Sequence, residues 1–118
     1  MLKHLKCLIV DDEPLAIDVI ENYLHRFEHV ITRRCENAIE AFRLMQEESF
    51  DLIFLDIEMP LMSGMDFLGT LKDPPLVIIT TAYRDHAVEG FEFEVLDYLI
   101  KPVSPDQLVE KAQATLAA

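Results

Sequence analysis

Four short apolar runs are spaced along the chain, and more polar segments separate them. The runs cover residues 7–10, 52–55, 76–79 and 98–100. Short continuous runs of this kind are typical of strands that are buried on both faces of a parallel sheet. A fifth, weaker strand is predicted over residues 30–35, because Arg33 and Arg34 interrupt its apolar pattern in a way that suits a sheet edge.

Between these strands, apolar residues recur at the spacing of an amphipathic helix. Pro14 suits the first turn of a helix after the first strand. Asn37, with Glu40 three residues later, and Ser104, followed by a proline, resemble the starts of two further helices. The third predicted helix is short and should stop at residues 73–75, and the fourth is the weakest. The apolar positions that define the five helices are Ala16, Ile20, Tyr23, Leu24 and Phe27; Ala38, Ala41, Phe42 and Met45; Met65, Leu68 and Leu71; Ala87, Val88 and Phe91; and Leu108, Ala112 and Leu116.

The alternation of strands and helices predicts one α/β domain over residues 1–118, since this length fits a single core. Repeated strand-helix units connect by right-handed crossovers and give a doubly wound parallel sheet covered on both faces. Five such units fit the flavodoxin-like (βα)5 fold, with a five-stranded parallel sheet in the order 2-1-3-4-5. That order also places the polar second strand at an edge.

Polar residues follow four of the strands directly. Asp11 and Asp12 come after the first strand, Asp56 after the third, Thr81 closely after the fourth, and Lys101 after the fifth. The carboxyl ends of the strands form the ligand crevice of an open α/β sheet. We therefore expect three carboxylates, a hydroxyl and an ammonium to lie at one rim of the sheet.

Three carboxylates at one rim need compensation. Two of them about 4 Å apart repel by roughly 4 kcal/mol at an effective dielectric constant of about 20. Lys101 offers only one positive charge, so a hard divalent ion with oxygen ligands completes the balance, and Mg²⁺ fits best. The alternative is that Asp11 and Asp12 merely cap the first helix, where its dipole favours negative charge.

At these residues the sequence resembles the receiver domains of bacterial two-component response regulators. The motifs are LIVDDE at residues 8–13, DIEMPLMSGM at residues 56–65 and KP at residues 101–102, and the resemblance covers essentially the whole chain. It implies that Asp56 accepts a phosphoryl group from a sensor histidine kinase. It also implies that Asp11 and Asp12 hold Mg²⁺ together with Asp56.

The resemblance assigns roles to further residues. Glu58 would complete the metal shell through its backbone carbonyl, and Lys101 would contact the phosphoryl group. Thr81 and Tyr98 would be the switch residues, and Pro102 would follow a cis peptide bond. The side chains two positions after Asp56 and Thr81, Glu58 and Tyr83, are expected to influence the phosphoryl lifetime in a direction that the sequence does not indicate. The output surface would be the face of the fourth helix, fifth strand and fifth helix, which could also form a homodimer.

Two segments carry a narrower resemblance. Residues 81–87 (TAYRDHA) and 91–102 (FEFEVLDYLIKP) are similar to receivers attached to LytTR-type DNA-binding domains. This resemblance implies that an output domain lies beyond residue 118 and that the protein regulates transcription. A stand-alone receiver is the alternative.

Composition limits the partners and the compartment. The net charge of -12 argues against direct binding of this domain to nucleic acid or to an anionic membrane. No apolar run approaches the ~20 residues of a membrane span, and no signal peptide is evident, so we expect a cytoplasmic protein. Cys7 and Cys35 form no metal-binding pair and are expected to be buried free thiols. The four histidines share no ligand spacing and are expected at the surface.

The resemblance implies a phosphoacceptor rather than an enzyme with a separate substrate: the domain would catalyse only its own Mg²⁺-dependent phosphorylation and dephosphorylation. Three other classes of protein are alternatives. An aspartyl phosphatase would use Glu58, two residues after the nucleophile, as its acid and base, but the chain has no cap domain. A flavodoxin would need a phosphate-binding loop where residues 11–14 would repel an anion. A degenerate receiver would lack an acidic or lysine position, and none is missing.

Overall fold

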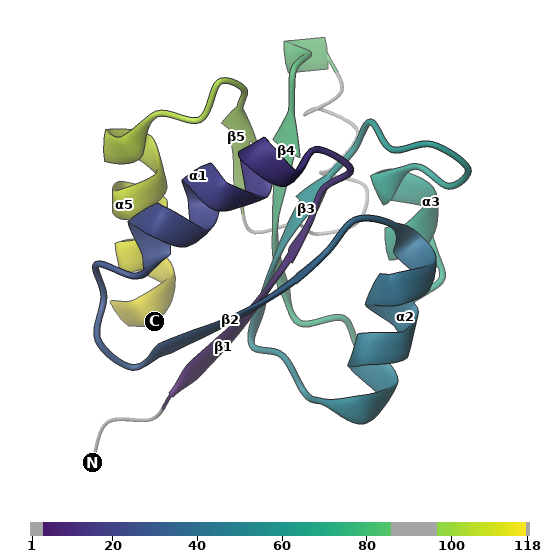
Figure 1. The fold of residues 1–118 in the computed structure, drawn as a ribbon, viewed down its shortest axis with the longest axis horizontal. Coiled ribbons are helices and arrows are strands. Elements are labelled where there is room, and N and C mark those ends of the chain that lie inside the picture. Colours follow the sequence, from purple (N-terminus) through teal and green to yellow (C-terminus); the bar gives the residue numbers. More distant parts are fainter. Residues whose placement is uncertain (1–3, 86–96, 118) are drawn as a thin grey trace.

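The computed structural model describes residues 4–85 and 97–117 and shows a five-stranded parallel sheet (Figure 1). The order is β2-β1-β3-β4-β5, which confirms the predicted fold class. The strands are β1 (Leu5–Val10), β2 (Val30–Cys35), β3 (Leu52–Asp56), β4 (Leu76–Thr81) and β5 (Asp97–Ile100).

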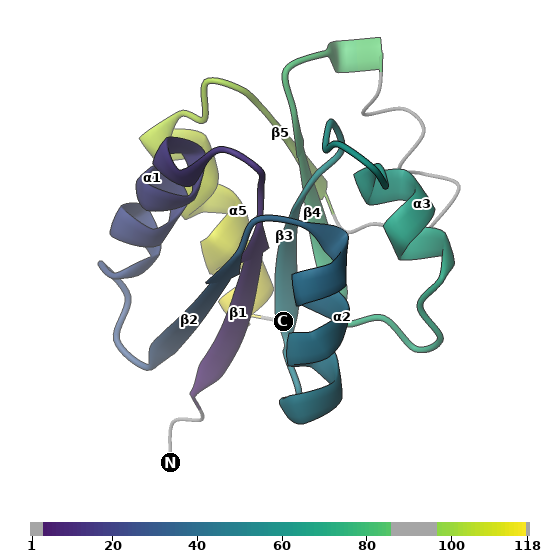
Figure 2. The ribbon, with the colours of Figure 1, turned by 45° about the vertical axis from the view of Figure 1, so that its right-hand side comes forward.

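Helices cover both faces of the sheet. They are α1 (Pro14–Leu24), α2 (Ala38–Glu47), α3 (Gly64–Gly69) and α5 (Pro105–Ala117). The pair α1 and α5 lies on one face, and α2 and α3 lie on the other (Figures 1 and 2). The fourth predicted helix, defined by Ala87, Val88 and Phe91, lies outside the described residues.

The two faces carry separate cores because side chains alternate along each strand. In β1, Cys7 and Ile9 pack with the buried side chains of α1 and α5, whereas Leu8 and Val10 pack on the side of α2 and α3. Both faces of the central strands are therefore apolar, and this explains the continuous apolar runs. Within the described residues, no helix has both the length and the apolar character that crossing a membrane requires.

The helix starts follow local signals. Pro14 occupies the first turn of α1. Asn37 Oδ1 accepts a hydrogen bond from the Glu40 N–H at 2.9 Å, as the spacing predicts. Ser63 caps α3 in the same manner, with 3.1 Å from its Oγ to Asp66 N, a cap that the sequence analysis missed. Because α3 ends at Gly69, it is shorter than its apolar pattern predicts.

The edge position of β2 is confirmed. Arg33 and Arg34 are exposed there and form ion pairs, the closest of them 2.7 Å from Arg34 Nη1 to Asp18 Oδ1. Cys7 and Cys35 are buried free thiols, as expected. Burial, with a smaller contribution from nearby carboxylates, raises the pKa of both thiols to about 12 and keeps them protonated. His4, His25 and His29 are exposed, and His86 lies outside the described residues.

Gly64 fastens the loop after β3 to the end of that strand. Its N–H donates to the Ile57 carbonyl at 2.9 Å, and a Cβ at this position would lie 2.2 Å from the Asp56 carbonyl oxygen. Its φ is not positive, so close backbone approach, rather than a left-handed turn, explains the glycine. The loop therefore packs directly against the backbone of Asp56.

Gly64→Ala should lower the free energy of unfolding by about 2–3 kcal/mol, because backbone atoms must move to admit the methyl group. Urea denaturation monitored by circular dichroism measures the change. Gly69→Ala is the matched control, since Gly69 is an exposed glycine of the same helix. Alanine there should be neutral or stabilising by up to about 1 kcal/mol. An unchanged urea midpoint for Gly64→Ala would contradict the close approach.

Candidate functional site

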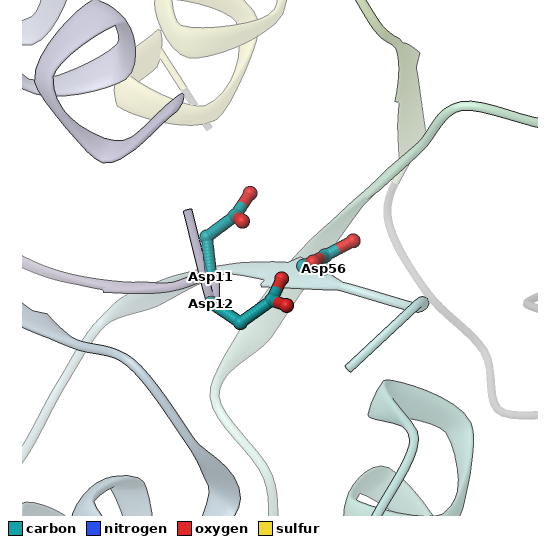
Figure 3. Close-up of side chains that lie close together, drawn as sticks. All are labelled: Asp11, Asp12 and Asp56. Carbon is teal, nitrogen blue, oxygen red and sulfur yellow. The ribbon is translucent and has the colours of Figure 1, made fainter. Parts of the chain in front are cut away.

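Three acidic side chains meet at the carboxyl ends of β1 and β3 (Figure 3). Asp11 and Asp12 follow β1, and Asp56 is the last residue of β3. One carboxylate oxygen from each of the three lies within 4.8 Å of the other two. Asp11 and Asp56 are buried, whereas Asp12 is exposed. The structure thus brings together the three acids that the strand ends predict.

Capping of the first helix does not account for this acidic pair. The N-cap of α1 is Glu13, and no side-chain hydrogen bond caps that helix end in the described structure. Asp11 Oδ1 accepts a bond from Glu13 N at 2.9 Å, which orients the carboxylate, while its Oδ2 faces the site. The alternative interpretation of Asp11 and Asp12 as simple caps is therefore wrong.

Lys101 reaches the same acids from β5. Its Nζ lies 2.8 Å from Asp11 Oδ2 and 3.3 Å from Asp56 Oδ1. The Lys101 N–H donates to the Thr81 carbonyl at 2.8 Å, which extends the pairing of β5 with β4 up to the lysine. The Lys101–Pro102 peptide bond is cis, as the resemblance implies.

The charges are not balanced within this group. Burial, followed by the charge of Asp11, raises the pKa of Asp56 from 3.8 to about 8, although Lys101 opposes the shift. Burial lowers the pKa of Lys101, but the hydrogen bond to Asp11 and the charge of Asp56 outweigh it, so the net shift is upward. Asp56 Oδ2 is buried with no hydrogen-bond partner in the described residues. An all-oxygen group with excess negative charge and an unpartnered buried oxygen fits Mg²⁺.

Thr81, at the end of β4, is fully buried and hydrogen-bonded to Glu58. Its Oγ1 donates to Glu58 Oε2 at 2.6 Å, and the Ala82 N–H donates to Glu58 Oε1 at 2.9 Å. The Glu58 N–H in turn donates to Asp56 Oδ1 at 3.2 Å. The sequence predicts a backbone role for Glu58 and an effect on phosphoryl lifetime, but no motif in it predicts these side-chain contacts.

Tyr98 lies in β5, half-buried against the core on the side of α2 and α3. Lys111 of α5 places its Nζ 4.9 Å from the ring centroid and also pairs with Asp97 Oδ1 at 2.7 Å. The ring is therefore held between the core and a charged group of α5. The fourth predicted helix, which the resemblance places beside this residue, is not among the described residues.

The sequence around this site matches a known protein family. The family model of the response regulator receiver domain matches residues 7–113. This chain belongs to the response regulator receiver domain family. The receivers of this family are the switches of two-component signalling, interact with histidine kinases and generally use Mg²⁺ at their acidic pocket.

Curated relatives and a solved structure agree with this family assignment. The chain is 41% identical over 106 residues to an uncharacterized response regulatory protein of Shewanella oneidensis, covering 86% of this chain and 44% of the relative. It is 39% identical over 116 residues to the transcriptional regulatory protein BtsR of Escherichia coli K12. This match covers 95% of this chain and 48% of the relative. The response regulatory domain of mrkE from Klebsiella pneumoniae superposes with a TM-score of 0.86 at 26% identity, covering 96% of each chain. The chain spans about half the length of the curated relatives it matches.

The raised pKa of Asp56 predicts a pH-dependent stability without divalent ions. The folded protein holds a proton on Asp56 that the unfolded chain loses above pH 3.8, so the free energy of unfolding falls as pH rises from about 4 to about 8. Asp56→Asn removes this titration. In EDTA at pH 8, we expect the free energy of unfolding of Asp56→Asn to be roughly 1–3 kcal/mol higher than that of the wild type. At pH 5 this difference should be smaller.

Urea denaturation at several pH values measures this gap. Asp66→Asn serves as the control, because Asp66 is an exposed carboxylate of α3 outside the acidic group. This variant keeps Asp56, so its free energy of unfolding should still fall as pH rises, as in the wild type. A difference between Asp56→Asn and the wild type that does not grow with pH would argue against the raised pKa.

Proposed function

We propose that this receiver is a phosphorylation-dependent switch whose acceptor is Asp56 and whose donor is a sensor histidine kinase. One observation carries the proposal: a buried Asp56 carboxylate lies 3.3 Å from Lys101 Nζ and within 4.8 Å of the Asp11 and Asp12 carboxylates. A nucleophilic carboxylate, a fixed cation and an acidic metal-binding group are the parts that phosphoryl transfer requires.

The chain's own residues divide the chemistry. An oxygen of Asp56 attacks the phosphorus of a phosphohistidine, the P–N bond breaks, and the imidazole leaves with the bonding electron pair. Lys101 neutralises an oxygen of the transferred group from its position beside Asp56. Asp11, Asp12, Asp56 and the backbone carbonyl of Glu58 would hold Mg²⁺, which when bound supplies positive charge that offsets the acids and the phosphoryl oxygens.

Phosphorylation then acts as a local change in charge. The acyl phosphate brings roughly two negative charges to the carboxyl end of β3. Thr81 would reorient to donate its hydroxyl to a phosphoryl oxygen, and Tyr98 would move into the space that Thr81 leaves. These movements would alter the face formed by the fourth predicted helix, β5 and α5.

We propose no turnover of a separate substrate; the domain would catalyse its own phosphorylation and its slow hydrolysis. In an aspartyl phosphatase, the carboxylate two residues after the nucleophile serves the substrate as acid and base. Here both oxygens of Glu58 accept hydrogen bonds from Thr81 and Ala82. Before phosphorylation Glu58 is thus engaged at the end of β4, which favours the switch over the phosphatase.

Incubation with a small phosphodonor and Mg²⁺ should add one phosphoryl group, detected by intact mass and released by hydroxylamine, as expected of an acyl phosphate. Asp56→Asn should reduce this label by at least about a hundredfold, because the nucleophile is gone. Asp66→Asn, which removes an exposed carboxylate, should be labelled like the wild type. Undiminished label on Asp56→Asn would refute the assignment of the acceptor.

We further propose a transcriptional output, with a LytTR-type DNA-binding domain beyond residue 118. Support comes from the TAYRDHA and FEFEVLDYLIKP segments, and from a relative named as a transcriptional regulatory protein that is about twice as long as this chain. The net charge of -12 leaves DNA contact to the output domain. Signalling of this kind takes place in the cytoplasm.

Activation should promote a homodimer through the face of the fourth predicted helix, β5 and α5. Sedimentation velocity with and without Mg²⁺ and beryllofluoride, an anion that imitates a phosphoryl group, measures this. We expect a larger dimer fraction with beryllofluoride in the wild type and none of this increase in Asp56→Asn. A monomer at every concentration in both conditions would speak against the dimer.

A further inference from the structure

Glu58 links the acceptor aspartate to the end of β4. Its backbone N–H donates to Asp56 Oδ1 at 3.2 Å, and its carboxylate accepts from Thr81 Oγ1 at 2.6 Å and from Ala82 N at 2.9 Å. The same residue therefore touches both the acceptor carboxylate and the switch hydroxyl. The donors on Thr81 and Ala82 lie one residue apart and converge on one carboxylate, and we call them the β4 donor pair.

The β4 donor pair has the character of a small anion site. A hydroxyl and a backbone N–H both direct their hydrogens at one anionic group, and hydrogen bonds to an ionised acceptor are stronger than neutral ones. Thr81 is fully buried, and its hydroxyl lies nearer to Glu58 Oε2, at 2.6 Å, than to its other acceptor, the Tyr83 carbonyl, at 3.2 Å. Whichever anion occupies the donor pair is therefore held tightly.

We infer that the Glu58 carboxylate is an internal occupant of the β4 donor pair and competes there with the phosphoryl group on Asp56. This inference rests on the proposed function and adds the sign of the Glu58 effect. A phosphoryl oxygen can take the hydroxyl of Thr81 only after Glu58 releases it. Glu58 is thus a positioning residue that holds the unphosphorylated arrangement of β4 and opposes activation.

Repulsion between the Glu58 carboxylate and the phosphoryl group adds to this competition. The arriving group is anionic and lands on the carboxylate that the Glu58 backbone contacts. Two anions cannot share one donor pair without strong repulsion. The Glu58 side chain must therefore swing away during activation, and its two hydrogen bonds to the β4 donor pair must be broken.

Beryllofluoride affinity at saturating Mg²⁺ tests the competition, measured by calorimetric titration. Glu58→Ala removes the competing carboxylate and should bind the anion about tenfold more tightly than the wild type, because strong hydrogen bonds no longer have to be broken. Glu58→Gln keeps the side-chain volume but removes the charge, and it should also bind more tightly. Glu47→Gln is the control, since it removes one charge from an exposed position on α2, and its affinity should match the wild type.

A second measurement excludes a purely structural effect. In the wild type, the Ala82 amide proton donates to a carboxylate, so its NMR resonance should shift upfield in Glu58→Ala. After beryllofluoride is added, the Ala82 resonances of the two proteins should coincide, because the same anion then occupies the donor pair. General loosening of the loop would not make them coincide.

The outcomes separate the two proposals. If the wild type binds beryllofluoride, and either Glu58 variant binds it equally or more weakly, competition by Glu58 is refuted while the switch function stands. Competition by Glu58 would also be refuted if the Ala82 resonances of the wild type and of Glu58→Ala still differed after beryllofluoride had bound. If the folded wild type neither binds beryllofluoride nor accepts a phosphoryl group, the proposed function fails and this inference fails with it.

Discussion

Repulsion among three carboxylates is the constraint on which the site depends. The fold places Asp11, Asp12 and Asp56 within 4.8 Å of one another and sets Lys101 against them. One ammonium against three acids leaves the group short of positive charge, and the raised pKa of Asp56 expresses this shortage. The large apolar cores on both sheet faces hold the strand ends together in spite of it. Because positive charge is short in this group, binding of a cation there would change its electrostatic energy strongly.

The strand order and the meeting of Asp11, Asp12, Asp56 and Lys101 could be predicted from sequence for one physical reason. Parallel strands end on the same edge, so residues that follow buried runs must meet there. The Glu58 contacts could not be predicted, because they depend on the path of the loop after β3. That path is set by the approach of Gly64 to the Asp56 backbone, which no periodic pattern reveals. The early end of α3 at Gly69 was missed for a similar reason.

The hydrogen bonds of Glu58 give the site a defined resting arrangement. Thr81 and Ala82 are satisfied by a side chain of the protein itself. In the proposed switch, the unphosphorylated state would therefore be a specific set of contacts and not merely the absence of a phosphoryl group. Tyr98, whose ring lies beside Lys111 of α5, pairs with Ile79 of β4 in the sheet. Under the proposed function, β4 and β5 would couple the acceptor to the output face.

If Asp56 is the acceptor, as proposed, the contact of Gly64 with the Asp56 backbone would give the response a direction. On the α3 side, the loop has no spare room, since even one methyl group would collide with the Asp56 carbonyl. On the β4 side, the neighbours of Asp56 are connected by side-chain hydrogen bonds that can be exchanged. A phosphoryl group on Asp56 would therefore meet closely packed backbone on the α3 side and exchangeable hydrogen bonds on the β4 side. Among the described residues, the proposed switch would therefore yield first on the side of β4 and β5.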